Sequence, residues 1–338
     1  MKGAVAICVN PMSGRDVRRL AAHASNMTHE IKRDMVARVA AGADVAGATD
    51  IFVTREPFRI TSLALEHMEL NASVHVLEHP IHNDARDTES AIHAFLACGC
   101  ETIVSLGGDG TNRVLVRALL DAQASETHLL ALSTGTNNVF PILAEPTIVG
   151  MVAGYQSSGQ LQDGAVKKRI KVLHVTNGAG TRPVADVGLI DATLLRRDHV
   201  GNLLPFDAAR IDRLLLTRAE PTAIGMSPIG GLVEVVEEHA DMGLLVELGG
   251  DAKFLVPISP GLFQSVAVKR TTKIPFDVPV EFCGPGVLAL DGDRDHKLQA
   301  DETLIVRIRR DGPWVIDIDQ AMRWLVAQGI IAKPLVRR

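Results

Sequence analysis

The sequence predicts an α/β protein in which a doubly wound parallel-sheet domain is followed by a mainly β domain, with a C-terminal helix that returns to the first domain. Three observations lead to this prediction. The 338 residues exceed the usual size of one hydrophobic core. Up to about residue 150, short apolar runs alternate with helical periodicities, as they do in βαβ units. From about Lys167, short strands of alternating polarity are separated by Gly, Pro and Asp.

The first half contains five apolar runs of strand length, bounded by polar or turn-forming residues. Between them, apolar residues recur at the i, i+3, i+4 spacing of a helix with one buried face. Two such stripes are Val17, Leu20, Ala21 and Ala24, and Leu115, Ala118, Leu119 and Ala122. The predicted strands are 4–9, 50–54, 73–77, 102–106 and 129–133.

In the second half the predicted strands include 170–175, 183–189, 244–248, 253–258 and 302–310. Near the end, segment 319–328 regains helical spacing, with Met322, Leu325 and Val326 on one side. We therefore expect the chain to return to its first domain. The predicted boundaries are 1–155 for the α/β domain, 160–316 for the β domain and 317–338 for the C-terminal helix and tail.

Composition excludes several classes of protein. The 46% hydrophobic and 22% charged content is that of an ordinary globular chain, and the net charge of -5 gives no electrostatic footprint for nucleic acid. We read the basic strip 167–169 as a solvated face or a strand edge. No run of about 18 apolar residues occurs, so we expect no membrane partner. The four cysteines lack metal-ligand spacing, and a cytoplasmic location is the expectation.

Three polar loops follow predicted strands. NPMSGRD follows the first strand, GGDGTN the fourth and STGTNNVFP the fifth. In open α/β sheets, ligands bind at the carboxyl ends of the strands, and the free N–H groups of a helix that begins there attract anions. No G-x-x-x-x-G-K-[ST] is present, and no G-x-G-x-x-G follows the first strand. The loops therefore predict a nucleotide-phosphate site of another kind.

The loop after the fourth strand is the most informative. Gly107, Gly108 and Gly110 would let the backbone wrap a phosphate chain, and Thr111 could cap the next helix or donate its hydroxyl. Asp109 would lie beside phosphate, where a carboxylate serves as a metal partner or as a base for an attacking hydroxyl. Alternatively, Asp109 caps its helix and the glycines make a tight turn. The pattern alone leaves both readings open.

These residues resemble a known superfamily. GGDGT at 107–111 is similar to the signature shared by NAD kinases and diacylglycerol-type lipid kinases, and NPMSG at 10–14 resembles the first loop of the lipid-kinase branch. Gly135, Thr136 and Asn137 match a Gly-x-Asn step of NAD kinases and also resemble the Gly-Thr-x-Asn of lipid kinases. This loop therefore does not separate the two branches.

The second half resembles NAD kinases. PTAIGMSPIGG at 221–231 is similar to their stretch from Gly-Ser-Thr-Ala-Tyr to Ser-Ala-Gly-Gly, PISPG at 257–261 to their Pro-Ile-x-Pro-His, and LDGDR at 290–294 to their late Asp-Gly step. Together with STGTNNVFP, this modified second half looks most like the acetoin catabolism protein X group, which is classed as ATP-NAD kinase-like.

The resemblance implies a fold, cofactors and site residues. ATP phosphates would lie along GGDGT with Mg²⁺ neutralising them, and Asp109 would take the acceptor proton or hold the metal. The implied nucleotide-binding residues are Asn10, Ser13, Gly107, Gly108, Gly110, Thr111 and Asn112. The implied acceptor-binding residues are Asn137, Asn138, Asp191, Thr222 and Ala223.

Asp293 is a second catalytic candidate. In the lipid kinases the acidic residue at the third position of the Asp-Gly-acid step serves as base, and Asp293 holds that position here. The alternative is a hairpin turn, for which Asp-Gly is a strong ordinary signal. Arg294, the next residue, could hold a phosphate or pair with Asp293 or Asp295.

Three departures bear on the acceptor. The Asn-Glu pair that holds the acceptor nucleotide in NAD kinases falls on Ile190 and Asp191, the tyrosine of Thr-Ala-Tyr on Ile224, and the histidine after Pro-Ile-x-Pro on Gly261. The expected function is an ATP-dependent kinase acting on NAD or a related small hydroxyl acceptor. A lipid or polyol kinase, or a nucleotide-sensing protein without catalysis, stays open. The resemblance also implies a homodimer or homotetramer.

Overall fold

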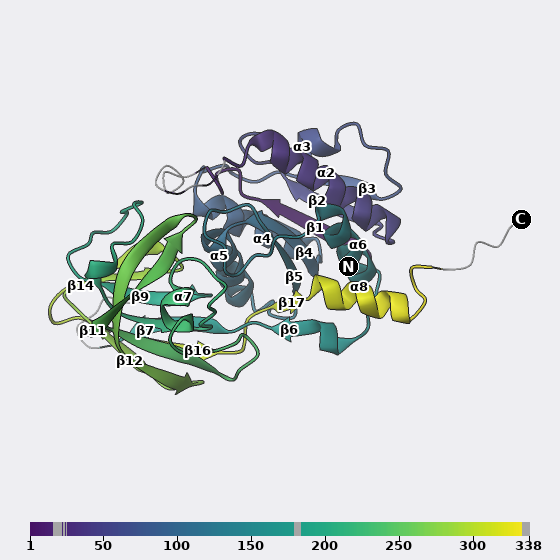
Figure 1. The fold of residues 1–338 in the computed structure, drawn as a ribbon. Helices are drawn as coiled ribbons and strands as arrows, with labels where there is room; N and C mark the ends of the chain where they lie inside the picture. Colours follow the sequence, from purple (N-terminus) through teal and green to yellow (C-terminus); the bar gives the residue numbers. More distant parts are fainter. Residues whose placement is uncertain (16–21, 23, 25, 179–183, 333–338) are drawn as a thin grey trace, which may run out of the picture.

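The computed structural model describes residues 1–15, 22, 24, 26–178 and 184–332. Two domains lie side by side in Figure 1, the α/β domain at the upper right and the β domain at the lower left. The described residues contain no helix that is both long and apolar enough to cross a membrane. The predicted helical stripe that begins at Val17 lies largely outside the described residues.

The first domain is built on a seven-stranded sheet, and the predicted fold class is confirmed. The five predicted strands are present, two of them one residue longer than expected. The strands are β1 (Ala4–Val9), β2 (Asp50–Thr54), β3 (Ser73–Leu77), β4 (Thr102–Gly107), β5 (His128–Ser133), β6 (Lys167–Arg169) and β17 (Trp314–Ile316). Their order is β3-β2-β1-β4-β5-β17-β6, and all pairs are parallel except β17 with β6.

Strands β6 and β17 come from the range 160–316 and complete this sheet. β6 carries the basic strip and forms the free edge, as one of the two readings of its sequence expected. Charged side chains at an edge oppose pairing with another sheet. β17 leads directly into α8, so the chain rejoins the first domain as a strand before it ends as a helix.

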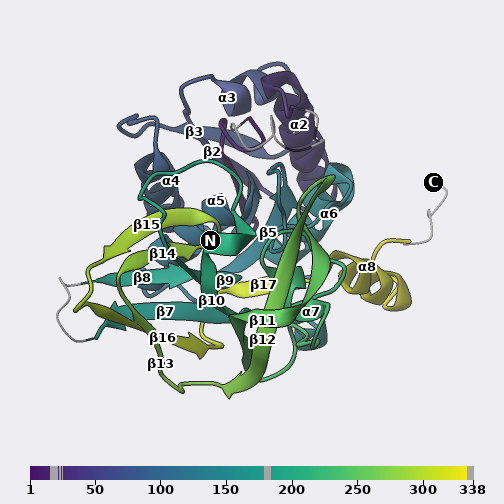
Figure 2. The same ribbon diagram turned by 60° about the vertical axis from the view of Figure 1, so that its left-hand side comes forward.

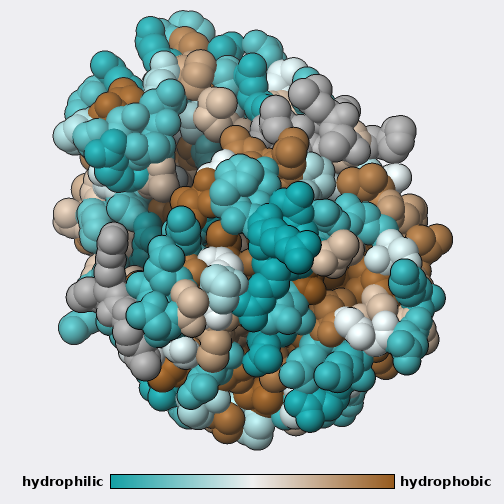
Figure 3. Space-filling model, turned by 90° about the vertical axis from the view of Figure 1, so that its left-hand side faces the viewer, coloured by the Kyte–Doolittle hydropathy of each residue, from teal (hydrophilic) through white to brown (hydrophobic). Residues whose placement is uncertain are grey.

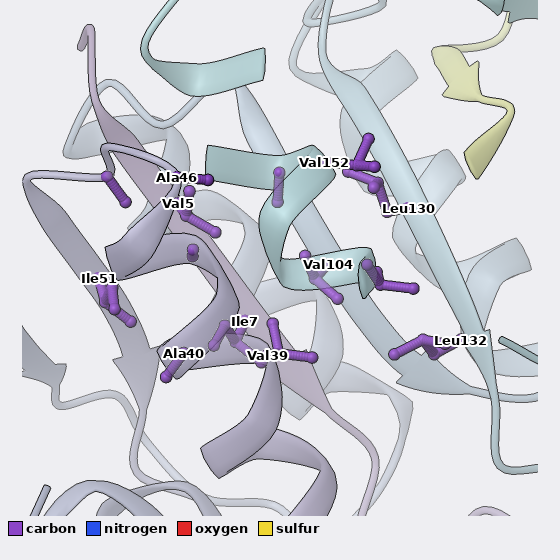
Figure 4. Close-up of a cluster of buried hydrophobic side chains, with 14 of the residues drawn as sticks. Val5, Ile7, Val39, Ala40, Ala46, Ile51, Val104, Leu130, Leu132 and Val152 are labelled. Atoms are coloured by element: carbon purple, nitrogen blue, oxygen red, sulfur yellow. The ribbon is translucent and has the colours of Figure 1, made fainter. Parts of the chain in front are cut away.

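Helices cover both faces of the sheet because strand residues alternate between them. Val5 and Ile7 pack toward one face, while Ala4 and Ala6 pack toward the other. Figure 4 shows this first face, with Val39 of one helix beside Ile7 and Val152 of another helix beside Leu130. The first face is covered by α2 (His29–Val45), α3 (Ile60–Leu65), α6 (Pro146–Ser157) and α8 (Ile318–Ala327), and the second by α4 (Ala85–Ala97) and α5 (Asp109–Asp121).

Glycines set the spacing of α2 and α6. A Cβ placed on Gly150 would lie 2.1 Å from the Val39 carbonyl oxygen, and one on Gly42 would lie 2.1 Å from the Thr147 carbonyl oxygen. Neither helix can carry a larger residue at these contacts without moving away. The close packing explains why helix-breaking residues occupy the interior of two buried helices.

The second domain consists of two antiparallel sheets, seen at the front of Figure 2. One has the order β12-β11-β10-β9-β14-β15 and the other the order β13-β16-β7-β8. Their bounds are β7 (Val172–Asn177), β8 (Ala185–Gly188), β9 (Asp191–Leu195), β10 (Ile211–Leu216), β11 (Met242–Ser259), β12 (Leu262–Pro275), β13 (Val280–Cys283), β14 (Gly286–Leu290), β15 (Asp293–Leu298) and β16 (Thr303–Arg309). A short helix, α7 (Ser227–Gly231), and two 3-10 turns, Gly164–Val166 and Ala208–Arg210, complete the elements.

One element differs from the prediction. Segments 244–248 and 253–258 were expected as two strands separated by a turn, whereas β11 runs through both. The residues between them form an irregularity in register, because Leu248 pairs with Val268 and Lys253 pairs with Ala267. The Gly-Gly-Asp signal therefore marks a bulge, and continued pairing with β12 on both sides keeps the strand intact.

Candidate active site

A cavity of about 550 Å³ lies between the two domains. The strand order of the first sheet reverses between β1 and β4, and the loops that follow these strands and β5 line the cavity. This is the switch point at which open α/β sheets bind ligands. Figure 3 shows apolar side chains along the recess that separates the upper and lower parts of this face. The second domain contributes Ile190, Asp191, Leu203–Phe206, Ile224–Met226, Ile258, Ser259 and Asp291–Asp293.

The backbone of the GGDGT turn lies directly against the backbone of the loop after β5. A Cβ on Gly135 would lie 2.7 Å from the Gly108 Cα, and a Cβ on Gly107 would lie 2.5 Å from the Thr111 Cβ. Only glycine fits at these contacts. Asn112, which is fully buried, fixes the turn by donating to the Gly108 carbonyl at 2.8 Å and accepting from the Ser105 hydroxyl at 2.6 Å.

Asp109 does not cap its own helix. The cap position of α5 is Gly108, which makes no side-chain cap hydrogen bond. The Asp109 carboxylate instead accepts the backbone N–H groups of Phe140 at 2.8 Å and Val139 at 3.1 Å. The structure thus rules out helix capping as the explanation of Asp109.

Burial raises the pKa of Asp109 to about 7, and the nearby Asp291 carboxyl acts in the same direction. The N–H groups of Phe140 and Val139 oppose this shift because they stabilise the ionised form. A carboxyl that titrates near neutrality is suited to exchange a proton with a hydroxyl.

Two further carboxyls, Asp191 and Asp291, lie buried on the second-domain side. Asp291 and Gly292 have φ values of 48° and 92° and form the two-residue turn between β14 and β15, so the hairpin reading of Asp-Gly is confirmed. The Asp291 carboxylate accepts the N–H groups of Leu189, Ile190 and Asp191 at 2.7 to 3.0 Å.

Burial raises the pKa of Asp191 well above its usual value, and the neighbouring Asp291 adds to the effect. Burial also raises the pKa of Asp291, while the Arg113 guanidinium opposes the shift. The Asp191 carboxylate accepts the Thr193 hydroxyl at 2.6 Å. Asp109, Asp191 and Asp291 thus form a group of mutually coupled acids contributed by both domains.

Asp293, the second catalytic candidate, faces the phosphate turn. Its Oδ2 would lie 2.8 Å from a Cβ on Gly110, and its side chain is 42% exposed. The guanidinium of Arg113, 4% exposed, lies 3.7 Å from Asp293 and 2.7 Å from Asp295. Arg113 also donates to the Leu290 carbonyl at 3.0 Å. One cation on α5 therefore ties the Asp291–Asp293 turn to the first domain.

Asp186 completes this network from β8. It lies 3.0 Å from Arg113, 3.2 Å from Arg117 and 2.8 Å from His296. Burial would raise the pKa of Asp186, but the His296 hydrogen bond and the Arg113 charge outweigh it and hold the pKa at about 2. This carboxylate is a structural counter-ion, unlike Asp109.

The NPMSG loop is held from below by Lys32 of α2. Its ammonium nitrogen lies 2.8 Å from the Asn10 carbonyl oxygen, 2.7 Å from that of Pro11 and 2.8 Å from that of Ser13, and the side chain is fully buried. Side chains of the loop reach the other two loops. The Asn10 amide donates to the Thr111 hydroxyl at 2.8 Å, and the Ser13 and Thr134 hydroxyls lie 2.6 Å apart.

The predicted acceptor residues divide into two sets. Asn137 and Asp191 line the cavity, and Asn138 lies beside them, donating to the Gly135 carbonyl. The Asn137 amide bridges the domains, because it donates to the Ile258 carbonyl at 3.0 Å and accepts from the Ser259 hydroxyl at 2.8 Å. Among the described residues that line the cavity, the 221–231 segment contributes Ile224–Met226 rather than Thr222 and Ala223.

The loop that precedes β10 forms an apolar part of the lining. Leu203 and Leu204 are 56% and 61% exposed at the cavity. Arg294 holds this loop: it lies 2.8 Å from Asp198, donates to the Leu204 carbonyl and stacks on the Phe206 ring at 4.3 Å. The ion pair of Arg294 with Asp198 and its contact with Phe206 thus involve this loop, whereas the sequence had left open a phosphate, Asp293 or Asp295.

The cavity is strongly acidic. The described residues that line it include no lysine or arginine. The acidic residues of the lining are Glu56, Asp84, Asp87, Asp109, Asp191, Asp291 and Asp293. In the part of the chain that the structure describes, no group of three acids, histidines or cysteines has metal-binding geometry. A polyanion could enter such a site only together with a cation that it carries itself.

Sequence reasoning missed the residues that act across long separations. Lys32, Arg113, Asp186 and Asp198 carry no local motif, and each has a partner that lies between 19 and 182 positions away along the chain. Of these four residues, Arg113 alone lies next to a motif, because it follows GGDGT by two positions.

Comparisons with known proteins agree with this geometry. Residues 55–147 match the diacylglycerol kinase catalytic domain, and residues 168–311 match the acetoin catabolism protein X C-terminal domain. The chain is 28% identical over 334 residues to acetoin catabolism protein X of Cupriavidus necator, covering 94% of this chain and 91% of that protein. Its fold is similar to yeast NADH kinase complexed with NADH, with a TM-score of 0.55 and 14% identity over 99% of this chain and 90% of that one. The chain therefore has an NAD kinase-like fold, and its two halves match a diacylglycerol kinase catalytic domain and an acetoin catabolism protein X C-terminal domain.

Proposed function

We propose that this protein transfers the γ-phosphoryl group of ATP to a hydroxyl group of a small acceptor, and that Asp109 takes the proton of that hydroxyl. The observation that carries the proposal is the position of Asp109: its carboxyl, with a pKa of about 7, lies at the start of α5 beside the three loops that line the cavity. Phosphoryl transfer needs little covalent chemistry from a protein, so a placed base and a phosphate cradle are its main requirements.

The nucleotide phosphates would lie along the Gly108–Thr111 turn at the start of α5, a helix whose N-cap makes no side-chain hydrogen bond. The residues present fit Mg²⁺ that arrives on ATP rather than a resident ion, because no preformed cluster exists among the described residues. If the ion contacts the protein directly, Asp109 is the residue that would bind it. When bound, the ion neutralises charge on the phosphates, and the acidic lining makes turnover depend strictly on it.

Two acceptor classes are favoured by different observations. NAD, or a related small hydroxyl compound, is favoured by the similarity of the fold to an NADH kinase. A lipid or polyol alcohol is favoured by the apolar lining from Leu203, Leu204 and Ile224 and by the match to the diacylglycerol kinase catalytic domain. Product analysis with NAD, NADH and diacylglycerol distinguishes them. We further propose that the protein acts in the cytoplasm as a homodimer or homotetramer, and light scattering of the purified protein tests the oligomeric state.

The test is ATP-dependent phosphorylation by the purified protein with Mg²⁺, compared with Asp109→Asn. The variant should lose about 10²- to 10⁴-fold in kcat, the usual contribution of a general base, while binding ATP normally in calorimetry. Full turnover by a correctly folded Asp109→Asn protein would show that Asp109 is not the base. ATP binding by the wild-type protein without transfer to any acceptor would instead support a nucleotide-sensing role.

A further inference from the structure

The connection between β9 and β10 places apolar side chains at the cavity of the candidate active site. We call residues 196–207 the β9–β10 loop. Leu203 and Leu204 of this loop line the cavity, and they are 56% and 61% exposed. Apolar side chains of this size are stabilised when another apolar group covers them. The β9–β10 loop therefore offers an uncovered apolar surface to a molecule that enters the cavity.

A buried arginine of β15 fixes the first part of this loop. The Arg294 guanidinium, 1% exposed, lies 2.8 Å from the Asp198 carboxylate. It also donates to the carbonyl oxygens of Asn202 at 2.6 Å and Leu204 at 3.0 Å, and it stacks on the Phe206 ring at 4.3 Å. A planar group with several N–H donors can make these contacts together, whereas the ammonium group of a lysine cannot. Arg294 therefore sets the position of the leucine pair.

A glutamine of β12 fixes the end of the same loop. The Gln264 side chain donates to the Phe206 carbonyl at 2.7 Å and accepts the Ala208 N–H at 2.7 Å. The backbone is thus held on both sides of Pro205 by contacts to two different strands. A surface that is already fixed in place costs less conformational entropy when a ligand binds to it.

The charged residues that the second domain contributes to this cavity are all acidic. They are Asp191, Asp291 and Asp293, and no lysine or arginine among the described residues of that domain lines the cavity. Arg294 follows Asp293 in the chain, but its guanidinium is directed to the β9–β10 loop. A ligand with a phosphate or carboxylate would face these acids without a protein cation to bind it. The second-domain side of the cavity therefore disfavours an anionic ligand.

We propose that the acceptor is an uncharged alcohol with an apolar carbon chain, that this chain lies on Leu203 and Leu204, and that Arg294 is the positioning residue of this surface. The inference rests on the proposed function, because it places the acceptor hydroxyl beside Asp109. In the transfer, the bond from the γ-phosphorus to the oxygen that bridges it to the β-phosphorus breaks, and a bond from the γ-phosphorus to the acceptor oxygen forms. The hydroxyl proton passes to Asp109, and ADP leaves. NAD, which carries a diphosphate, is then a poor acceptor.

Three diols with the same reacting end test the class of acceptor. Hexane-1,2-diol has an apolar chain, propane-1,2-diol has a chain three carbons shorter, and 5,6-dihydroxyhexanoate has the full length with a carboxylate at the far end. Formation of the phosphate ester from ATP and Mg²⁺ is measured by mass spectrometry, with NAD as a fourth acceptor. We expect kcat/KM for hexane-1,2-diol to exceed each of the other three about tenfold or more, because every buried methylene group adds to binding.

Variants of the loop test its residues. Leu204→Ala should lower kcat/KM for hexane-1,2-diol and leave that for propane-1,2-diol unchanged. Leu204→Lys should raise kcat/KM for 5,6-dihydroxyhexanoate relative to hexane-1,2-diol, because a cation would then face the acceptor. Leu255→Ala is the matched control, since Leu255 is 65% exposed on β11 and is not among the residues that line the cavity.

The positioning role of Arg294 predicts a selective change in KM. Arg294→Lys keeps the charge but loses the planar fork, so KM for hexane-1,2-diol should rise about fivefold while kcat and KM for ATP stay as in the wild type. The double variant Leu204→Ala/Arg294→Lys should lose no more than Leu204→Ala alone, because both changes remove the same contact. Equal losses with hexane-1,2-diol and propane-1,2-diol in Arg294→Lys would overturn this role.

The outcomes separate this inference from the proposed function. Transfer to 5,6-dihydroxyhexanoate or NAD that equals or exceeds transfer to hexane-1,2-diol would overturn the inference and leave the proposed function standing. No transfer to any of the four acceptors would overturn both. If Arg294→Lys fails to fold, the two Leu204 variants still decide the class of acceptor, because the Leu204 side chain is largely exposed.

Discussion

At the scale of single residues, Asp109 combines burial with two N–H donors. Burial alone would keep the carboxyl protonated, and the N–H groups of Val139 and Phe140 bring its pKa back to about 7. An isolated aspartate titrates near 3.9 and would be a weaker base toward a hydroxyl. The surroundings of Asp109 therefore matter as much as its identity.

This pKa predicts the pH dependence of phosphoryl transfer. Because the base acts in its ionised form, kcat/KM should rise with pH and reach half its plateau at about pH 7. Initial rates between pH 5 and 9, with ATP binding measured at each pH as the control, check this prediction. A midpoint near pH 4 would contradict the assignment of Asp109 as the base.

The raised pKa of Asp191 lowers the stability of the folded protein at high pH. Its pKa is raised in the folded protein, so the folded state holds the proton more tightly than the unfolded state, and its contribution to stability falls as pH rises from about 4 toward the folded pKa. Asp191→Asn removes this cost and keeps an acceptor for the Thr193 hydroxyl. Each unit of raised pKa corresponds to about 1.4 kcal/mol.

The free energy of unfolding of Asp191→Asn should therefore exceed that of the wild type at pH 8, and the gain should shrink at pH 4. Urea denaturation at both pH values measures it. Thr193→Val is a useful control, because it removes the hydroxyl that Asp191 accepts without changing charge. A gain that is equal at both pH values would show that Asp191 is not under electrostatic strain.

At the scale of elements, the contact between α2 and α6 predicts a stability loss on adding one methyl group. Gly150→Ala places a Cβ against the Val39 carbonyl oxygen, so the helices must separate. Overpacking of this kind costs about 1–3 kcal/mol, against a gain in helix propensity of about 1 kcal/mol. We expect a net loss, measured as a lower urea midpoint. Gly164→Ala, whose Cβ would have no neighbour within 4 Å, is the matched control and should change little.

Elements with regular patterns could be predicted from the sequence, and irregular ones could not. The first five strands follow from uninterrupted apolar runs, and α8 (Ile318–Ala327) follows from its 3.6-residue spacing. In contrast, β11 continues across a Gly-Gly-Asp segment that is locally a turn signal. Pairing with β12 decides that case, and pairing is a tertiary property that local sequence does not encode.

In the candidate site, too, local features could be predicted from the sequence and long-range contacts could not. The loops that bear Asn10, Asp109 and Asn137 were predictable because turn-forming residues at strand ends are local features. The contacts that organise them were not, since Asp109 is held by N–H groups 30 residues away and Asn137 by a hydroxyl 122 residues away. The roles of these residues, as opposed to their places, stay predictions until catalysis is measured.

At the scale of the whole molecule, the candidate site exists only when both domains are in place. Asp109 and Arg113 belong to the first domain, whereas Asp191, Asp291 and Asp293 belong to the second. Arg113 joins the two sides through Asp186, Asp293 and Asp295. A change in the angle between the domains would therefore alter the spacing of the acids and the shape of the cavity together.

The position of Lys32 has a consequence for ionic strength. Three carbonyl oxygens surround its nitrogen, and only an ammonium group has three N–H donors to satisfy them, so the positive charge is fixed beneath the NPMSG loop. Dissolved ions screen exposed charges over about 8 to 10 Å, but they do not reach a side chain with no exposed surface. The contacts that hold the NPMSG loop in place should therefore keep their strength when salt is added.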